Sequence, residues 1–297
     1  MKAMAKHEKT VGKLVFILPS FLIVTLFITY PFLSGLHLAF TDWDGISKDM
    51  RNVGLDNFKE LFSDGVFYLS LKNTAIFTVL VTALQHIISL VIAVLIDKKM
   101  RGSEFYKAVL FIPCLLSTVV IGAVFGTILN PINGTLNKGL AFLGFETLSQ
   151  ADWLGDPRLS LYVVIMANVW QWIGYSMVIY LAGLQSVSAE LVEASRIDGA
   201  NAWQGFKNIE FPSIAPAFTI NTVLSVVGCL KAFEIIFVMT GGGPGNATEI
   251  IGTYIYNKGF TSSRFGYGTA VSLVLFIFII IVSFIQVKML RAREEDL

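Results

Sequence analysis

The chain has 297 residues, of which 55% are hydrophobic and only 14% are charged. Soluble domains carry about 25% charged residues, so this composition excludes an ordinary water-soluble domain. The formal net charge of +1 excludes the strong basic excess that is typical of a nucleic-acid-binding protein. Cys114 and Cys229 both lie in apolar runs, which excludes a disulfide scaffold and a zinc site built from CxxC pairs. The composition therefore indicates a polytopic membrane protein, surrounded mainly by lipid.

Six apolar segments are long enough to cross a membrane as helices, because a span needs about 20 residues. They are Leu14–Phe40, Thr74–Ile96, Ala108–Leu129, Ser160–Leu184, Ile214–Thr240 and Thr269–Val287. We therefore expect an all-α, polytopic bundle of six transmembrane helices over residues 14–287. Pro31 predicts a kink or a tilt in the first span. A secretory signal peptide is the alternative for that segment, but the apolar stretch is too long and no small-residue cleavage site follows it.

Lysine and arginine residues predict the orientation of the spans, because they are enriched in cytoplasmic connections. They are concentrated in the N-terminal tail 1–13, in the second and fourth connections, and in the C-terminal tail 288–297. These residues are Lys2, Lys6, Lys9, Lys13, Lys98, Lys99, Arg101, Lys107, Arg196, Lys207, Lys288, Arg291 and Arg293. We expect both termini to be cytoplasmic, which agrees with an even number of spans.

The fourth connection, residues 185–211, has the pattern of two short helices rather than of a loop. Ser188 is a good N-cap for a helix over 189–197. Gly199 then interrupts the pattern, as a residue that tolerates positive φ does after a helix. A second helical pattern follows over 202–209.

The second of these helices carries Trp203 and Phe206, which a solvated loop does not need. Apolar side chains on a cytoplasmic helix favour a docking surface for a soluble partner, by helix-in-groove contact. The alternative is that the two helices only cover the cytoplasmic ends of the bundle.

The same connection resembles the EAA loop of ABC importer permeases. Glu193-Ala194-Ser195 is followed after three residues by Gly199, after nine more by Ile209, and after one more by Phe211-Pro212. Ser195 and Phe211 replace the alanine and the leucine of the family pattern, which are small changes in size and polarity. Other stretches are similar to the carbohydrate branch of the family: Arg196–Ala200, Thr240–Pro244, Phe265–Gly268, Leu55–Phe58 and Tyr30-Pro31.

This resemblance implies the type I importer permease fold in a bacterial plasma membrane. It also implies a second permease subunit, two ATP-binding cassette subunits and an extracellular sugar-binding protein. In the family, the loop that corresponds to 185–211 couples the permease to the ATPase. The matching contact residues here would be Glu193, Ala194, Ser195, Asp198 and Gly199.

Nucleotide-binding and hydrolase motifs are absent from the sequence. There is no GxxxxGK[ST], so ATP and magnesium are expected on a separate ATPase chain, and no cofactor is expected on this one. There is also no HExxH and no GxSxG, so we expect a transporter subunit rather than an enzyme.

Two regions are candidates for binding a solute. Lys231 and Glu234 are the only charged residues in the six predicted spans, and charges at membrane depth are usually functional. On a continuous helix they would be neighbours, so neutralising each other is an equally good explanation. The stretch 168–175 gathers amide and aromatic side chains near the middle of the fourth span. Aromatic rings can stack on sugar faces while amides bind hydroxyls.

In similar sugar permeases, substrate contacts come from the spans on either side of the EAA loop. The resemblance thus implies the positions Gln171, Trp172, Tyr175, Ser225, Gly228, Cys229 and Ala232. We expect the permease subunit of an ATP-driven sugar importer that works by alternating access. The alternatives are a member of the same family that imports another solute, such as glycerol 3-phosphate, and an ion-coupled secondary transporter.

Overall fold

The computed structural model describes residues 17–98 and 102–295. The predicted tail 1–13, the beginning of the first span at Leu14, and Lys99 and Arg101 lie outside the described residues. So do the last two residues of the predicted tail 288–297.

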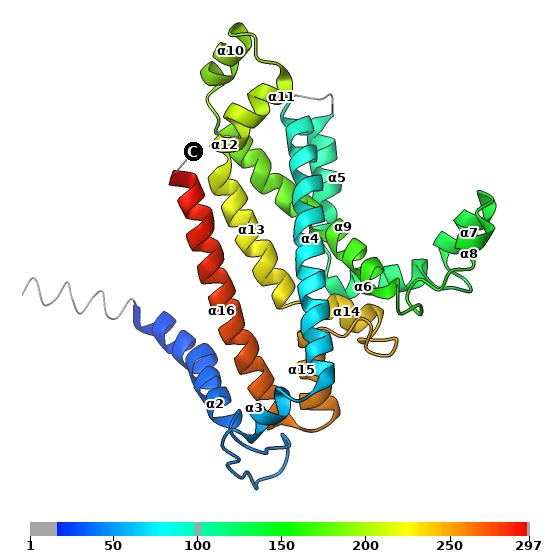
Figure 1. Ribbon diagram of the computed structural model, residues 1–297, viewed down its shortest axis with the longest axis vertical. Coiled ribbons are helices and arrows are strands. Elements are labelled where there is room, and N and C mark those ends of the chain that lie inside the picture. Colours follow the sequence, from blue (N-terminus) through cyan, green and yellow to red (C-terminus); the bar gives the residue numbers. More distant parts are fainter. Residues whose placement is uncertain (1–16, 99–101, 296–297) are drawn as a thin grey trace, which may run out of the picture. The chain divides into compact units, whose positions relative to one another are not determined.

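Regular structure in the described part of the chain is helical, apart from one isolated antiparallel bridge between Thr41 and Asn52 (Figure 1). This confirms the predicted all-α class. After the helical start at Ile17, the elements are η1 (Thr25–Thr29), α2 (Tyr30–Leu38), α3 (Asp56–Leu61), α4 (Gly65–Asp97), α5 (Ser103–Leu115), α6 (Thr118–Ile128), α7 (Thr135–Phe142), α8 (Glu146–Ser149), α9 (Ser160–Gln185), α10 (Ala189–Ile197), α11 (Ala202–Gly205), η2 (Phe206–Glu210), α12 (Phe211–Ser213), α13 (Ala215–Leu230), α14 (Glu234–Met239), α15 (Ile251–Tyr256), η3 (Asn257–Thr261) and α16 (Phe265–Glu295).

Four helices in the described residues are long and apolar enough to cross a membrane: Ile17–Leu38, α4, α9 and α16. The number rises to six if two bent pairs are each one span: α5 with α6, and residues 202–213 with α13. In the first helix, the π-helical turn η1 ends at Thr29, two residues before Pro31, which has no backbone N–H to donate. The predicted fourth span, Ser160–Leu184, agrees with α9 to within one residue.

The third predicted span is not one continuous helix but two helices that meet at a sharp bend. Helix α5 ends at Leu115, and α6 begins at Thr118 at an angle of 98° to it. Leu116 and Ser117 between them have ψ values of 145° and 136°, which are extended rather than helical. Pro113 removes one backbone donor from the last turn of α5, which weakens the helix at this point.

The fifth predicted span, 214–240, is also interrupted. Helix α13 ends at Leu230, the backbone of Phe233 has φ −147° and ψ −60°, and α14 begins at Glu234. Lys231 and Glu234 therefore lie on either side of a break. The expectation that they occupy neighbouring positions on one helix was wrong.

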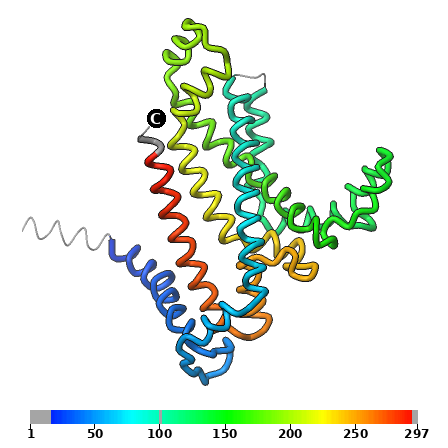
Figure 2. The backbone as a smooth tube through the Cα atoms, viewed as in Figure 1, coloured from blue at the N-terminus to red at the C-terminus, as the bar shows by residue number. Residues whose placement is uncertain are grey.

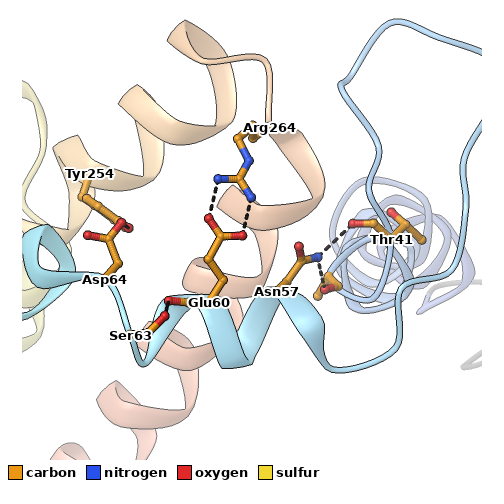
Figure 3. Close-up of polar contacts among 8 residues, drawn as sticks. Thr41, Asn57, Glu60, Ser63, Asp64, Tyr254 and Arg264 are labelled. Atoms are coloured by element: carbon orange, nitrogen blue, oxygen red, sulfur yellow. Dashed lines mark hydrogen bonds and ion pairs between the residues drawn. The ribbon is translucent and has the colours of Figure 1, made fainter.

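One compact unit consists of the chain up to Ser63 together with Ile255–Val274. In its described part, Glu60 and Arg264 form a two-pronged ion pair with N–O distances of 2.5 and 2.6 Å (Figure 3). The amide of Asn57 donates to the carbonyl oxygens of Ala39 and Thr41, both at 2.9 Å. The Asn57 bonds hold α3 to the chain that follows α2, and the ion pair holds α3 to the residue before α16.

The second compact unit consists of Asp64–Tyr254 and the end of the chain from Leu275. Helices α4, α9 and α13 contact one another and form its core, and α14 packs on α6 (Figure 2). Two clusters of buried side chains fill the core, one around Phe77 and Val164 and the other around Met177 and Tyr180. At one end, the hydroxyl of Tyr254 donates to Asp64 over 2.7 Å (Figure 3).

Candidate functional site

A cavity of about 500 Å³ lies between α4, α9, α13 and α14. Its lining includes all but one of the residues that were predicted to bind a solute: Trp172, Tyr175, Ser225, Gly228, Cys229, Lys231, Ala232 and Glu234. Trp172 lies near the middle of α9, roughly 20 Å from either helix end at 1.5 Å per residue. The structure thus brings these residues together at mid-bundle depth.

The cavity combines aromatic rings with hydrogen-bonding amides. The rings of Trp172 and Tyr175 meet edge to face, with centroids 5.9 Å apart and an interplanar angle of 90°. Gln85, Asn168 and Asn221 add amide groups to the lining. Such a surface can stack against the apolar face of a ring-shaped solute and bind its hydroxyls.

The two charged residues both line this cavity, because the break after α13 turns them toward it. Among the described residues, no ion pair joins Lys231 to Glu234, and both side chains are exposed. The cavity therefore offers one cation and one anion, with no net formal charge.

Gln171 is the one predicted solute contact that does not line the cavity. Its side chain is buried and donates to the backbone oxygen of Leu116 over 3.3 Å and to the Thr118 hydroxyl over 3.2 Å. These two acceptors lie at the break between α5 and α6. Gln171 thus satisfies backbone that the break leaves unpaired.

Sequence reasoning did not single out Gln85 on α4 as part of the lining. Its amide donates to the Ser176 hydroxyl over 2.5 Å, and Ser176 donates to Asn221 over 2.9 Å. This buried network joins α4, α9 and α13 at the edge of the cavity. An amide inside a long apolar run was the signal available in the sequence, because polar groups at membrane depth need partners.

Beyond one end of α4, α9 and α13 lie α10 and α11, whereas α14 lies at the opposite end (Figure 1). Helix α10 follows Ser188, as predicted, and ends in a Schellman motif. Gly199 has φ +86°, its N–H donates to Arg196, and the N–H of Ala200 donates to Ser195. The predicted glycine bend is therefore present, and Asn201 and Gln204 form a capping box that begins α11.

Four of the five residues matched to the EAA pattern are exposed: Glu193, Ala194, Asp198 and Gly199. The fifth, Ser195, is half-buried, and its hydroxyl donates to the carbonyl of Val192 over 2.8 Å. A Cβ atom at Gly205 would lie 3.7 Å from that hydroxyl, so Ser195 faces α11 rather than solvent. Trp203 is 69% exposed and Ile197 is 86% exposed, which leaves apolar surface uncovered next to the matched residues.

The sequence matches one protein family over residues 90–294, the family described as binding-protein-dependent transport system inner membrane component. The probable starch degradation products transport system permease protein of Thermoanaerobacterium thermosulfurigenes is 33% identical, over 95% of this chain and 94% of that protein. The multiple sugar-binding transport system permease protein of Streptococcus mutans is 32% identical, over 94% of this chain and 95% of that protein.

A crystal structure of a bacterial ABC transporter involved in the import of alginate contains a chain of similar fold. The TM-score is 0.86 and the sequence identity is 24%, over 98% of this chain and 99% of the other. The likeness in fold thus covers nearly the whole length of both chains.

Proposed function

Because this chain belongs to the family of inner membrane components of binding-protein-dependent transport systems, we propose that it is the permease subunit of an ATP-driven importer of a sugar or oligosaccharide. The single observation that carries the choice of solute is the cavity between α4, α9, α13 and α14. Its paired rings and three amides suit a polyhydroxylated ring better than an ion. The names of relatives that transport starch degradation products and multiple sugars agree with this choice.

In this proposal, residues 14–287 form six spans with both termini in the cytoplasm of a bacterial cell. The bent pair α5 and α6 counts as one span, and the fifth span runs from 214 to 240 through α13 and α14. The chain pairs with a second permease, because six spans enclose too little space for a sugar path. Two ATPase subunits bind ATP and magnesium, and an extracellular binding protein delivers the sugar. The chain itself carries no catalytic step.

The connection 185–211 is the coupling segment in this proposal. The exposed residues Glu193, Ala194, Asp198 and Gly199 contact the ATPase, and Ser195 keeps α10 and α11 together from the inside. Closure of the ATPases on ATP moves this segment and reorients the bundle around the cavity, which is alternating access.

Two other functions are less favoured. Glycerol 3-phosphate calls for a basic cluster, whereas the only lysine that lines the cavity, Lys231, shares it with the carboxylate of Glu234. An ion-coupled secondary transporter would have no use for the coupling segment, and the family depends on binding proteins.

Substitution of Gly199 tests the coupling assignment in a complex reconstituted with the partner subunits. Valine is β-branched and strained at φ +86°, although no other atom lies within 4 Å of the new Cβ. We expect Gly199→Val to abolish sugar-stimulated ATP hydrolysis. Gly205→Ala is the matched control, since its Cβ makes only an ordinary contact at 3.7 Å. Full stimulation in Gly199→Val would show that the segment is not the coupling element.

A further inference from the structure

Aromatic side chains make continuous ring contacts from the coupling segment into the bundle. The ring centroid of the exposed Trp203 lies 5.8 Å from that of Phe206. Phe206 lies 5.9 Å from Phe211, and Phe211 lies 6.0 Å from Phe218 on α13. We call these four residues the ring series. It begins at a side chain that faces solvent and ends at one packed among buried residues.

The π-helical turn η2 makes the contact between Phe206 and Phe211. In a regular α-helix, residues five apart are rotated by roughly 140° about the axis, so their side chains diverge. Here the N–H of Phe211 donates to the carbonyl of Phe206, five residues back, and the two rings meet. Single π-turns inside helices are common at functional sites. The π-turn thus brings together two rings that a regular α-helix would hold apart.

The contact between Phe211 and Phe218 crosses a sharp bend. Residues Ala202–Ser213 and Ala215–Leu230 meet there at 68°. Ile214, at the bend, is buried, and a Cβ atom at Gly183 of α9 would lie 2.9 Å from that of Ala217 and 3.4 Å from that of Ile214. The bend is therefore seated directly against α9, which provides a fixed pivot.

The inner end of the ring series touches the helices that form the cavity. The ring of Phe218 lies 5.6 Å from His86 on α4 and 6.3 Å from Tyr180 on α9. His86 and Tyr180 are hydrogen-bonded to each other. The residue next to His86 is Gln85, which lines the cavity and is linked through Ser176 to α13.

We infer that Phe211 and Phe218 are positioning residues that transmit movement of the coupling segment to the cavity, an inference that rests on the proposed function. When the ATPase displaces the segment about the pivot at Ile214, Phe211 displaces Phe218 against His86 and Tyr180. That changes the angle of α13 relative to α4 and α9. Close-packed rings have few rotamers, so they carry a displacement that a flexible side chain would absorb.

The test uses the complex of this chain with its second permease, ATPase and binding protein in proteoliposomes. Phe218→Leu keeps an apolar side chain but removes the ring, and Phe218→Tyr restores the ring. Phe125→Leu is the matched control, because Phe125 is also half-buried and pairs with Trp170 at 5.4 Å, outside the ring series. We expect Phe218→Leu to lower the sugar transported per ATP hydrolysed by about fivefold or more. Phe218→Tyr and Phe125→Leu should stay within about twofold of the unsubstituted complex.

Cys229 lines the cavity and is buried in this structure, so its reactivity should rise when a rearrangement exposes it. In a Cys114→Ser background, the rate at which a small methanethiosulfonate modifies Cys229 is measured with and without a nonhydrolysable ATP analogue. We expect the nucleotide to change this rate in the background protein and in Phe125→Leu, but not in Phe218→Leu. If the Phe218→Leu complex does not assemble, Phe211→Leu is used instead. It removes the other ring of the same contact at a more exposed position.

The possible outcomes separate the two proposals. If the unsubstituted complex shows no sugar-stimulated ATP hydrolysis, the proposed function is wrong, and the inference is overturned with it. If that complex is active but Phe218→Leu and Phe211→Leu both keep the transport ratio and the nucleotide-dependent change at Cys229, only the role of the ring series is refuted.

Discussion

Gly174 on α9 lies directly against the backbone of α5. A Cβ atom there would lie 1.9 Å from the carbonyl oxygen of Leu110 and 2.8 Å from the Cα atom of Phe111, both on α5. Small residues allow membrane helices to pack at such short distances. Gly174→Ala is therefore a perturbation of one methyl group at a defined interface.

The structure fixes the size of the expected effect. Ordinary van der Waals contact begins near 3.4 Å, so the backbone of α5 must move by about 1.5 Å. The obstructing atoms belong to backbone and cannot rotate away. Overpacking costs about 1–3 kcal/mol, whereas glycine to alanine in a helix otherwise gains up to about 1 kcal/mol. We expect a net loss of roughly 1–2 kcal/mol.

The assay is the midpoint of thermal unfolding of the purified protein in detergent, which should fall by roughly 5 °C. Gly126→Ala is the matched control, because Gly126 lies inside α6 with no neighbouring atom within 4 Å of the new Cβ. The control should be neutral or slightly stabilising. The reasoning is refuted if Gly174→Ala is as stable as Gly126→Ala.

Three further predictions concern buried, exposed and cavity-lining groups. The amide nitrogen of Asn73 lies 3.0–3.3 Å from the carbonyl oxygens of residues 246, 247 and 249. Asn73→Ala should therefore lower the free energy of unfolding by about 1–3 kcal/mol, and an unchanged midpoint of unfolding would contradict this. The pair of Glu60 and Arg264 is exposed, so Arg264→Lys should cost less than about 1 kcal/mol and less at high salt; a larger, salt-independent loss would be unexpected. Trp172→Ala and Tyr175→Ala should each weaken the apparent sugar affinity by roughly fivefold, whereas Tyr175→Phe, which keeps the ring, should not. Unchanged uptake in both alanine variants would show that this part of α9 does not line the solute path.

The sequence predicted helices well where an apolar run was uninterrupted. The expected span Ser160–Leu184 and helix α9 agree to within one residue. Helix α10 begins directly after Ser188, as predicted, although the Ser188 hydroxyl makes no capping hydrogen bond. The bend at Gly199 was equally predictable, because a positive φ after a helix selects glycine. Local chemistry is sufficient in these cases.

The two helix breaks could not be read from hydropathy. Leu116, between α5 and α6, is as apolar as its helical neighbours, and its extended backbone is held by the side chain of Gln171, far away in sequence. The break after α13 brings Lys231 and Glu234 onto one cavity, a placement that depends on how α14 packs against α6. Tertiary contacts decide both breaks, so hydropathy alone predicts neither of them.

The most direct test of the account is sugar uptake into proteoliposomes that contain this chain, its second permease and the ATPase, with the binding protein outside. We predict that sugar accumulates only when ATP is enclosed with the ATPase, and that Gly199→Val stops accumulation while Gly205→Ala does not. Accumulation driven by an ion gradient in the absence of ATP would contradict the account.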